Sequence, residues 1–307
     1  MRVLVTGGTG MVGSAFKKYE DNGVIRVGSK DFDLTDYESC CNMIEENKPD
    51  AIIHLAAKVG GVKGNTDLVG EFFRDNILMN TNLLESSRVM GVGKVISMLS
   101  TCIYPDKCEY PLTEDQIHLG PPHESNYGYA YAKRMIHVQS MAYRQQWGCN
   151  FVVAVPNNLY GEHDNFHMEH SHVVPAMIRK MYEAKANGLD YITLWGDGSP
   201  LREFTYSKDI ADALMLILND YNSKDPINIG NSNEMSIQYL AEKIKEKIGF
   251  SGDIIWDTSM PSGQMRKPSS SEVFKDIYPD FKFTDLDDGI ESVCRWFEDS
   301  YPNIRGI

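Results

Sequence analysis

The chain has 307 residues, 42% of them hydrophobic, and a formal net charge of −13 at pH 7. This length allows a large buried core, and the acidic balance argues against a surface for nucleic acid or an anionic membrane. Six cysteines without metal-ligand or disulfide-framework spacing indicate reduced thiols inside a cell. No apolar run reaches about 18 residues and a strand is expected from position 2, so we expect a cytoplasmic protein without a signal peptide or membrane span.

The first half of the chain alternates short apolar runs with helical patterns. The expected strands cover Arg2–Thr6, Val24–Val27, Ala51–Leu55, Lys94–Leu99, Asn150–Val155 and, later, Ile227–Ile229. The expected helices cover Met11 to about Asn22, Asp36–Asn47, Phe72–Met90, Tyr127–Trp147, Val174–Lys185 and Ser236–Ile248. Such alternation predicts βαβ units and an α/β fold with a Rossmann-type, doubly wound parallel sheet. Residues 156–200 are expected to hold loops and the single helix near Val174–Lys185, and Gly263–Ser271 a polar loop.

The turn after the first strand carries the motif Gly7-x-x-Gly10-x-x-Gly13. Glycines permit a positive φ and a close approach of the backbone to a ligand, and the N-terminus of the next helix attracts a pyrophosphate. A strand before the motif and a helix after it are the context in which such a motif binds a dinucleotide. We therefore expect cofactor contacts from Gly7, Thr9, Gly10, Met11, Val12 and Gly13.

The end of the second strand distinguishes the two nicotinamide cofactors. Proteins that bind NAD usually place an acidic side chain there, on the ribose 2′-hydroxyl. Here the strand ends Val27-Gly-Ser29-Lys30, and Ser29 and Lys30 could accept a 2′-phosphate that a carboxylate would repel. The alternative is that Lys30 is only a solvated turn residue, with Asp31 beside it. The pattern favours NADP(H).

Tyr129 and Lys133 are four residues apart in an expected helix, so their side chains share one face. An ammonium beside a phenol of reference pKa about 10 would lower that pKa, and a shift of about three units is worth roughly 4 kcal/mol. Ser100 follows an expected strand, where its hydroxyl could hydrogen-bond a substrate carbonyl beside Tyr129; alternatively, it only caps the strand end. The three residues together predict a site for proton transfer.

The order of these motifs resembles the extended short-chain dehydrogenase/reductase family. Further segments resemble the GDP-fucose synthase branch of that family, namely Ser100-Thr-Cys102-Ile-Tyr-Pro105, Asn158-Leu-Tyr-Gly161, His163-Asp-Asn-Phe166, Ser171-His172-Val and Trp195-Gly-Asp-Gly. The resemblance spans almost the whole chain. It implies that Lys133 also binds the nicotinamide ribose. It implies further cofactor contacts from Asp33, Leu34, Leu55, Ala56, Ala57, Pro156, Asn158, Leu159 and His172.

The resemblance also implies a reaction. The branch converts GDP-4-keto-6-deoxy-D-mannose to GDP-L-fucose, by epimerisation at carbons 3 and 5 and by reduction of carbon 4 with NADPH. Tyr129 would deliver the proton to the reduced carbonyl, and Ser100 and Tyr129 would stabilise the enolate of the epimerisation. Cys102 and His172 match the two extra proton-transfer groups of the branch, although a lone Cys or His is more often structural.

Other reactions of the same fold remain as alternatives. One is a sugar-nucleotide 4-epimerase or 4,6-dehydratase that retains NAD, but dehydratases place acidic residues just after the active-site Ser or Thr, where this chain has Cys102. Another is a catalytically dead, cofactor-sensing regulator, which typically lacks the Tyr or the Lys that this chain keeps. By the same resemblance, residues 1–157 with about 203–230 would bind NADP, and residues 158–202 and 231–307 would form an interleaved substrate lobe.

A GDP-sugar needs cations for its diphosphate and a surface for its base. Arg202, Arg179 or Lys180, and Lys267 are the candidate cations, Asn158 matches the sugar-binding asparagine, and Trp195 is placed to wall the nucleoside. Each cation has the alternative of being merely solvated. The chain departs from the family pattern at two positions: Asn157 stands in place of Thr and Glu162 in place of Pro, and Glu162 adds charge near the sugar loop.

Three further expectations concern the surroundings of the site. The residues Gly60-Gly61-Val-Lys-Gly64-Asn65 would form a flexible loop over the nicotinamide and hexose. The cluster His163, His167, His170 and His172 invites a zinc site, but no carboxylate or thiolate completes a spaced set and we expect no metal. By resemblance, Phe72–Met90 and Tyr127–Trp147 would pair across a two-fold axis into a four-helix homodimer interface.

Overall fold

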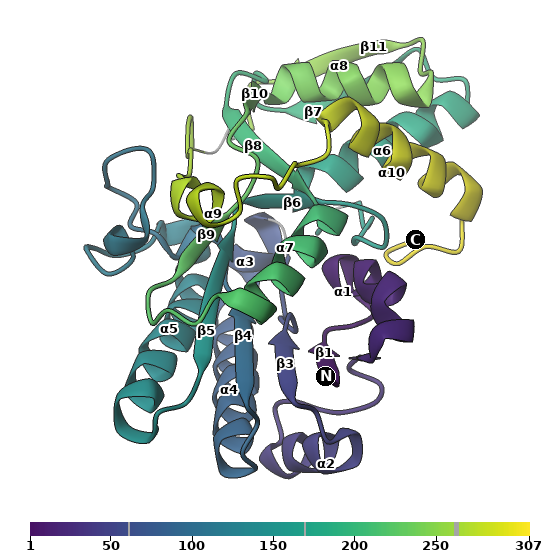
Figure 1. The fold of residues 1–307 in the computed structure, drawn as a ribbon. Helices are drawn as coiled ribbons and strands as arrows, with labels where there is room; N and C mark the ends of the chain where they lie inside the picture. Colours follow the sequence, from purple (N-terminus) through teal and green to yellow (C-terminus); the bar gives the residue numbers. More distant parts are fainter. Residues whose placement is uncertain (61, 169, 261–263) are drawn as a thin grey trace.

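A parallel sheet forms the centre of the computed structural model, which describes residues 1–60, 62–168, 170–260 and 264–307. Its strands are β1 (Val3–Thr6), β2 (Val24–Val27), β3 (Ala51–His54), β4 (Lys94–Met98), β5 (Phe151–Pro156) and β9 (Ile227–Ile229). Within the described ranges these six strands lie in the order β2-β1-β3-β4-β5-β9 and all pairs are parallel (Figure 1). The predicted fold class is confirmed.

Helices cover both faces of this sheet because each face is apolar along buried strands such as Val3–Thr6. On one face α1 (Met11–Ala15) and α7 (Ser207–Asp220) pack into a core with β1, β3 and β9. On the other face lie α2 (Tyr37–Asn47), α4 (Val69–Val89) and α5 (Tyr127–Trp147). The helix α4 packs along α5 (Figure 1).

A second lobe has its own core and stands over the carboxyl ends of the central strands (Figure 1). It contains a sheet of β6 (Asn158–Tyr160), β8 (Leu201–Tyr206) and β10 (Glu234–Ser236), and a parallel pair of β7 (Tyr191–Trp195) and β11 (Asp253–Asp257). Its long helices are α6 (Val173–Ala186), α8 (Ile237–Ile248) and α10 (Leu286–Ser300). Two shorter helices are α3 (Val62–Asp67) and α9 (Glu272–Ile277), and α9 packs against β9.

Several expected elements differ from the structure. The single helix expected from Met11 to Asn22 is a short α-helix followed by a 3₁₀ helix (Phe16–Asn22) that ends at Gly23, whose φ is 88°. The expectation of loops and one helix over residues 156–200 is wrong, because β6 and β7 also lie there.

The flexible loop expected from Gly60 to Asn65 is also wrong, because α3 begins at Val62. Gly61 in that loop and Gly263, at the start of the expected polar loop, lie outside the described residues. The domain division stays a prediction. Two elements cross the expected boundary. Phe274 of α9, from the expected substrate lobe, packs in the core of the central sheet. Phe204 and Tyr206 of β8, from the expected NADP-binding part, pack in the core of the second lobe.

A buried ammonium ties α7 to the central sheet. The Nζ atom of Lys94, at the start of β4, donates to the carbonyls of Ile217 (2.8 Å), Leu218 (2.8 Å) and Tyr221 (2.7 Å). Carbonyls at the end of a helix have few partners within it, and of these three the Ile217 carbonyl also accepts from the Tyr221 N–H at 3.1 Å. The Lys94 ammonium therefore adds donors where the helix has few. Burial lowers the pKa of Lys94 to about 8.

The strand order fixes where a ligand can bind. The chain runs from β1 to β2 on one side and returns to β3 on the other, so the order reverses at β1 and β3. Ligands of open α/β sheets bind at such a reversal, beyond the carboxyl ends of the strands. The glycine turn follows β1, the segment 55–58 follows β3, and Ser100 closely follows β4, so the predicted site residues meet there. None of the described helices has the length and apolarity needed to cross a bilayer.

Candidate active site

The glycine turn is folded tightly against the end of β3. Gly7 has a φ of 69°, and a Cβ atom on it would lie 2.8 Å from the backbone nitrogen of Ala56. A Cβ atom on Gly13 would lie 2.2 Å from the carbonyl oxygen of Gly7. The backbone N–H of Gly10 donates to that same oxygen at 3.0 Å. Larger side chains would therefore open the turn that a dinucleotide approaches.

Some neighbours of this turn pack in the core, and others are exposed to solvent beside it. Val12 is buried in the core and Met11 packs against it, so these two residues could reach a cofactor mainly through their backbone. Thr9 lies against Gly28, where an added Cβ would be 2.9 Å from the Thr9 hydroxyl oxygen. Ser29 and Lys30 are exposed beside it. The Asp31 carboxylate accepts a hydrogen bond from the Gly28 N–H at 2.7 Å, so this acid is used to close the turn.

One cation at this end was missed from the sequence. Arg26 of β2 donates from Nη1 to the carbonyl of Gly8 at 2.9 Å and from Nε to Glu20 at 2.7 Å. Its guanidinium therefore braces the glycine turn. The signal in the sequence was an arginine inside an otherwise apolar strand, where Arg26 is partly buried between Ile25 and Val27.

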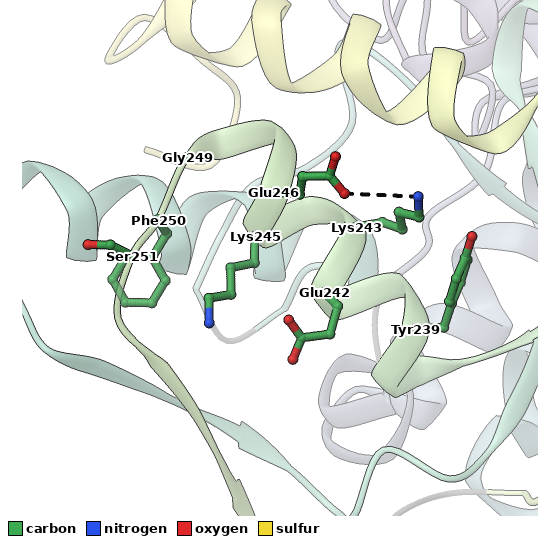
Figure 2. A pocket seen from close by; sticks show the side chains of 8 residues that line it. All are labelled: Tyr239, Glu242, Lys243, Lys245, Glu246, Gly249, Phe250 and Ser251. Atoms are coloured by element: carbon green, nitrogen blue, oxygen red, sulfur yellow. Dashed lines mark ion pairs between the residues drawn. The ribbon is translucent and has the colours of Figure 1, made fainter.

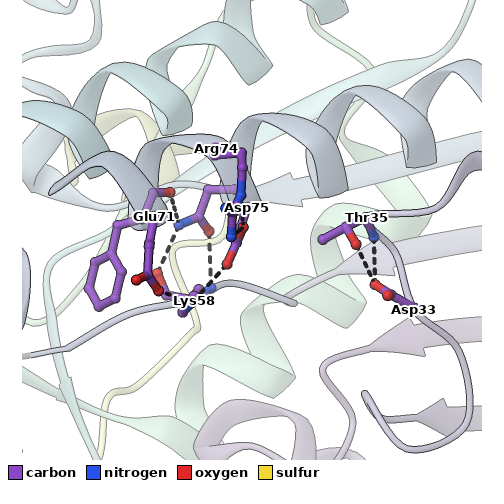
Figure 3. A network of polar contacts seen from close by, with 8 residues as sticks. Asp33, Thr35, Lys58, Glu71, Arg74 and Asp75 are labelled. Carbon is purple, nitrogen blue, oxygen red and sulfur yellow. Dashed lines mark hydrogen bonds and ion pairs between the residues drawn. The ribbon is translucent and has the colours of Figure 1, made fainter. Parts of the chain in front are cut away.

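The side chains after β2 and β3 are held by local polar contacts (Figure 3). The Asp33 carboxylate accepts from the backbone N–H and the hydroxyl of Thr35, at 2.9 Å and 2.7 Å. Lys58 pairs with Glu71 at 3.1 Å and with Asp75 at 2.7 Å, both on α4. The remaining predicted residues here and beyond β5 are buried or partly buried: Leu34, Leu55, Ala56, Ala57, Pro156 and Leu159.

A buried hydrogen-bond chain runs from the glycine turn to the catalytic helix. Fully buried His54, at the end of β3, bonds through Nδ1 to the Thr6 hydroxyl at 2.8 Å and through Nε2 to the Asn80 amide oxygen at 2.9 Å. The Asn80 amide nitrogen donates to the carbonyl of Ala132 at 3.5 Å. Because that amide group donates on its nitrogen side, its oxygen must accept, so Nε2 of His54 carries the proton. Sequence patterning gave no sign of this chain.

The predicted pair Tyr129 and Lys133 lies on one face of α5, and the two residues are 8% and 2% exposed. The ammonium of Lys133 donates to the carbonyl of Met98 at 3.0 Å, and burial lowers the pKa of Lys133 to about 8. The expected lowering of the Tyr129 pKa is wrong. Burial raises this pKa well above its usual range, and the nearby Cys102 raises it further. Tyr129 therefore keeps its proton at neutral pH, as a proton donor requires.

Cys102 joins this group. Burial raises the pKa of its thiol, while the Lys267 ammonium, a hydrogen bond with Ser100 and the Lys133 ammonium oppose that rise. Burial also lowers the pKa of Lys267. The structure thus brings together Ser100, Cys102, Tyr129, Lys133 and Lys267, which the sequence places on three separate segments.

His172 lies at the start of α6, and its Nδ1 atom is 3.8 Å from a carboxylate oxygen of Asp164. Burial alone would lower the pKa of His172, but the hydrogen bond and charge of Asp164 outweigh burial and raise it. Its charged neighbours are Asp164 and Arg305, so the part of His172 in the site stays a prediction.

The predicted substrate residues fall into two sets. On β8 and β6, half-buried Arg202 donates to the carbonyl of Leu201 at 2.7 Å, and Asn158 donates to the carbonyl of Glu203 at 2.9 Å. Trp195, 52% exposed, ends β7. Burial lowers the pKa of Arg202.

The other two cations lie on α6. Arg179 bonds to Glu183 at 2.7 Å and to the carbonyls of Phe166 and Gly306 at 2.9 Å and 2.7 Å. Its role in substrate binding stays a prediction. Lys180 donates to the carbonyl of Thr193 at 3.1 Å.

The charge of Glu162 is compensated. Its carboxylate accepts from the Tyr206 hydroxyl at 2.6 Å and pairs with Lys208 at 2.7 Å. Burial would raise the pKa of Glu162, but Lys208 and Tyr206 lower it overall. The concern that Glu162 adds free charge near the sugar loop is therefore removed.

The histidine-rich segment is packed against rings. His163 lies on Trp296 with centroids 4.8 Å apart, and His167 stacks on His170 at 4.9 Å. In the described parts of the chain no group of three or more His, Cys, Asp or Glu side chains is placed to hold a metal ion. The absence of a metal stays a prediction.

An open hollow on the second lobe lies away from these groups. Figure 2 shows Lys243 and Glu246 facing one another there, 3.9 Å apart. It runs along α8 and contains none of the predicted site residues; its lining is Tyr239, Glu242, Lys243, Lys245, Glu246, Gly249, Phe250 and Ser251.

Comparison with known proteins agrees with this geometry. Residues 3–230 match the model of the NAD dependent epimerase/dehydratase family, and the chain belongs to that family. It is 44% identical to GDP-L-fucose synthase of Dictyostelium discoideum, over 99% of this chain and 97% of the relative, and 40% identical to a probable GDP-L-fucose synthase of Drosophila melanogaster, over 99% of each. Within the family it belongs with the GDP-L-fucose synthases, as predicted.

A solved structure shows the same fold. The crystal structure of a GDP-L-fucose synthetase from Naegleria fowleri bound to NADP has a TM-score of 0.92 and 39% identity, and the match covers 99% of this chain and 95% of that chain. The family resemblance seen in the motifs therefore extends to the whole tertiary structure.

We expect the His54→Leu variant to be less stable by about 2–5 kcal/mol, because the Thr6 hydroxyl and the Asn80 oxygen lose their partner. Burial, with the charge of Lys133, lowers the pKa of His54 to about 3. A depressed pKa makes stability fall as pH drops below about 6.5, at about 1.4 kcal/mol per pH unit until pH 3. The loss between pH 7 and pH 5 should therefore be about 2 kcal/mol smaller in the variant.

Urea denaturation at pH 7 and pH 5 measures both effects. The exposed His118→Leu variant is the control and should stay within about 0.5 kcal/mol of the parent at pH 7. An unchanged difference between the two pH values in His54→Leu would contradict the assignment of a neutral, buried imidazole.

Proposed function

We propose that this chain converts GDP-4-keto-6-deoxy-D-mannose to GDP-L-fucose, by epimerisation at carbons 3 and 5 followed by NADPH-dependent reduction of the 4-keto group. The observation that carries the proposal is the convergence of Cys102 with Ser100, Tyr129 and Lys133. A reductase alone needs only the last three residues. The thiol within the same group adds the proton-transfer capacity that epimerisation requires.

The residues around β1 and β3 fit NADPH. The Gly7 and Gly13 positions leave no room for a side chain, so the backbone can approach a pyrophosphate. Exposed Ser29 and Lys30 would hold the 2′-phosphate, since Asp31 is engaged with the turn. Bound NADPH supplies the hydride. A GDP-L-fucose synthetase of the same fold is known with NADP.

Epimerisation needs groups that give and take protons near neutral pH. The 4-keto group acidifies the protons on carbons 3 and 5, and hydrogen bonds from Ser100 and Tyr129 would stabilise the enolate. Asp164 raises the pKa of His172 above its usual value, which favours the protonated imidazole as a proton donor. Lys267 favours the thiolate of Cys102. The two groups would act on the hexose from the two lobes.

Reduction uses the raised pKa of Tyr129. The phenol stays protonated until the carbonyl oxygen gains negative charge, and then donates its proton. Lys133, close to β4, would hold the nicotinamide ribose and compensate the phenolate that forms. Arg202 and Lys267 would bind the diphosphate and the nucleotide or sugar end, and Asn158 the hexose.

We also propose a homodimer through α4 and α5. Both helices carry apolar side chains on the surface, among them Phe73, Leu78 and Val138. Pairing these helices across a two-fold axis would bury this surface in a four-helix bundle.

Incubation with GDP-4-keto-6-deoxy-D-mannose and NADPH tests the function directly. We expect oxidation of NADPH, followed by the absorbance of the reduced nicotinamide, and a product with the stereochemistry of GDP-L-fucose. Recovery of a product that keeps the configuration at carbons 3 and 5 would limit the protein to reduction. No oxidation of NADPH would favour the NAD-retaining 4-epimerase or 4,6-dehydratase.

Tyr129→Phe should lower the rate of NADPH oxidation by at least about a hundredfold, because the proton donor is lost while the ring volume stays. The matched control is Tyr131→Phe on the same helix, which should keep the parental rate. Rapid oxidation by Tyr129→Phe would remove Tyr129 from the mechanism.

The parent should bind NADPH more tightly than NADH, and Lys30→Ala should reduce this preference about tenfold, or about 1.4 kcal/mol. Fluorescence titration with both cofactors gives the two Kd values. Lys224→Ala, which removes another exposed lysine, is the control. Equal affinities for both cofactors in the parent would refute the assignment of Lys30.

Cys102→Ser and His172→Gln should separate the two activities. Because neither residue belongs to the Ser100, Tyr129 and Lys133 trio, residual reduction should remain and yield unepimerised or singly epimerised product. Deuterium exchange from solvent at carbons 3 and 5 should slow by about a hundredfold or more, since a hydroxyl and an amide do not titrate near pH 7.

The controls for this experiment remove similar groups nearby. Cys108→Ser and His170→Gln should exchange deuterium at the parental rate. If Cys102→Ser and His172→Gln also exchange at that rate, both residues are structural and epimerisation uses other groups.

A further inference from the structure

One buried carboxylate lies among the segments that carry the proposed substrate residues. Glu203 of β8 is 2% exposed. Its Oε2 atom accepts from the backbone N–H of Ser269 at 3.0 Å and from the Ser269 hydroxyl at 2.8 Å. Lys267 stands two residues before Ser269, so this contact fixes the segment of Lys267 against β8.

The same oxygen also binds the segment that precedes β6. The amide nitrogen of Asn157 donates to Oε2 of Glu203 at 3.3 Å and to the carbonyl of Asn231 at 3.0 Å. The Asn157 amide oxygen accepts from the Thr205 hydroxyl at 2.7 Å. The next residue, Asn158, donates its own side-chain N–H to the backbone carbonyl of Glu203 at 2.9 Å.

The third segment is β8 itself. Side chains of successive strand residues point to opposite faces, so Arg202 and Glu203 lie on opposite sides of β8. Glu203 thus holds the strand from one side while Arg202 is available on the other. Each proposed substrate residue is therefore close in sequence to Glu203 or to one of its partners. Asn158 follows Asn157, Lys267 is two residues before Ser269, and Arg202 directly precedes Glu203.

Stability alone gives little reason for this carboxylate. The three hydrogen bonds that Oε2 accepts all come from neutral groups, and burying a charge without a counter-charge costs free energy. Burial raises the pKa of Glu203 accordingly. The free energy spent on burying the carboxylate is explained if this one acceptor holds several segments of the chain together.

We propose that Glu203 is a positioning residue that holds Asn158, Arg202 and Lys267 in register for the GDP-sugar, and that Asn157 completes its contacts in this chain. Asn157 stands where the family pattern has Thr; its amide nitrogen donates to both Glu203 and Asn231, whereas a threonine hydroxyl has only one hydrogen to donate. A Cβ atom on Gly230 would lie 2.3 Å from the Asn157 amide nitrogen, so Gly230 leaves room for this side chain. The inference rests on the proposed function, which assigns the three residues to the substrate.

The test compares Glu203→Ala with Glu203→Gln by calorimetric titration of GDP and NADPH, and by steady-state kinetics. Alanine removes the acceptor, whereas glutamine keeps a carbonyl oxygen that can accept the same hydrogen bonds. For Glu203→Ala we expect at least a tenfold rise in the Kd of GDP and in KM for the sugar nucleotide. Its kcat and its Kd for NADPH should stay within threefold of the parent, and glutamine should restore GDP binding to within threefold.

Two milder variants keep the test decisive if Glu203→Ala does not fold. Ser269→Ala and Asn157→Thr each remove one donor, and each should raise the Kd of GDP about threefold without changing the Kd of NADPH. The exposed Glu272→Ala, in the same region of the chain, is the control and should bind GDP like the parent.

The outcomes separate this inference from the proposed function. Parental Kd values for GDP in the Glu203, Ser269 and Asn157 variants would overturn the inference even if the parent makes GDP-L-fucose. Equal losses of GDP and NADPH binding would also overturn it, because they indicate general structural damage. A parent that binds GDP but does not convert the sugar would contradict the proposed function, while selective loss of GDP binding in the variants would still support Glu203 as the positioning residue.

Discussion

The rest of the site depends on the hydrogen-bond chain that His54 makes between Thr6 and Asn80. Its two ends lie at Thr6, just before the glycine turn, and at Ala132, on the helix of Lys133. A neutral imidazole with its proton on Nε2 can make both bonds, whereas a charged one would lose its acceptor on Nδ1. Burial enforces the neutral form, so the distance between the cofactor turn and the catalytic helix is held constant across the physiological pH range.

The electrostatics of the catalytic group follow from burial. Removal from water raises the pKa values of Tyr129 and Cys102 and lowers that of Lys133, so each group favours its neutral form more than it would in water. The positive charges of Lys267 and Lys133, with the hydrogen bond from Ser100, favour the thiolate. A site of this kind keeps its protons in place until a substrate oxygen develops charge, which suits both the enolate and the alkoxide of the proposed reaction.

The sequence predicted the central sheet well because each of its strands is a short apolar run, and it predicted α5 to the residue because Gly148 ends that helix with a φ of 70°. It failed over residues 156–200, where the alternation of β7 does favour a strand but covers only the five residues Tyr191–Trp195 and was missed. It could name Tyr129 and Cys102 from family motifs. It could not show that the Arg179 guanidinium donates to the backbone carbonyls of Phe166 and Gly306, because those partners lie far from Arg179 along the chain.

Lys94 offers a chemical view of how the central layers separate. Its amine has a pKa near 8, so at mildly alkaline pH a large fraction is in the neutral, nucleophilic form, yet the end of α7 closes it off from water. An amine-reactive reagent can reach it only when α7 lifts from β4. The rate at which Lys94 is labelled therefore depends on how often α7 separates from β4. The labelling rate of an exposed lysine such as Lys224 depends only on the reactivity of the reagent.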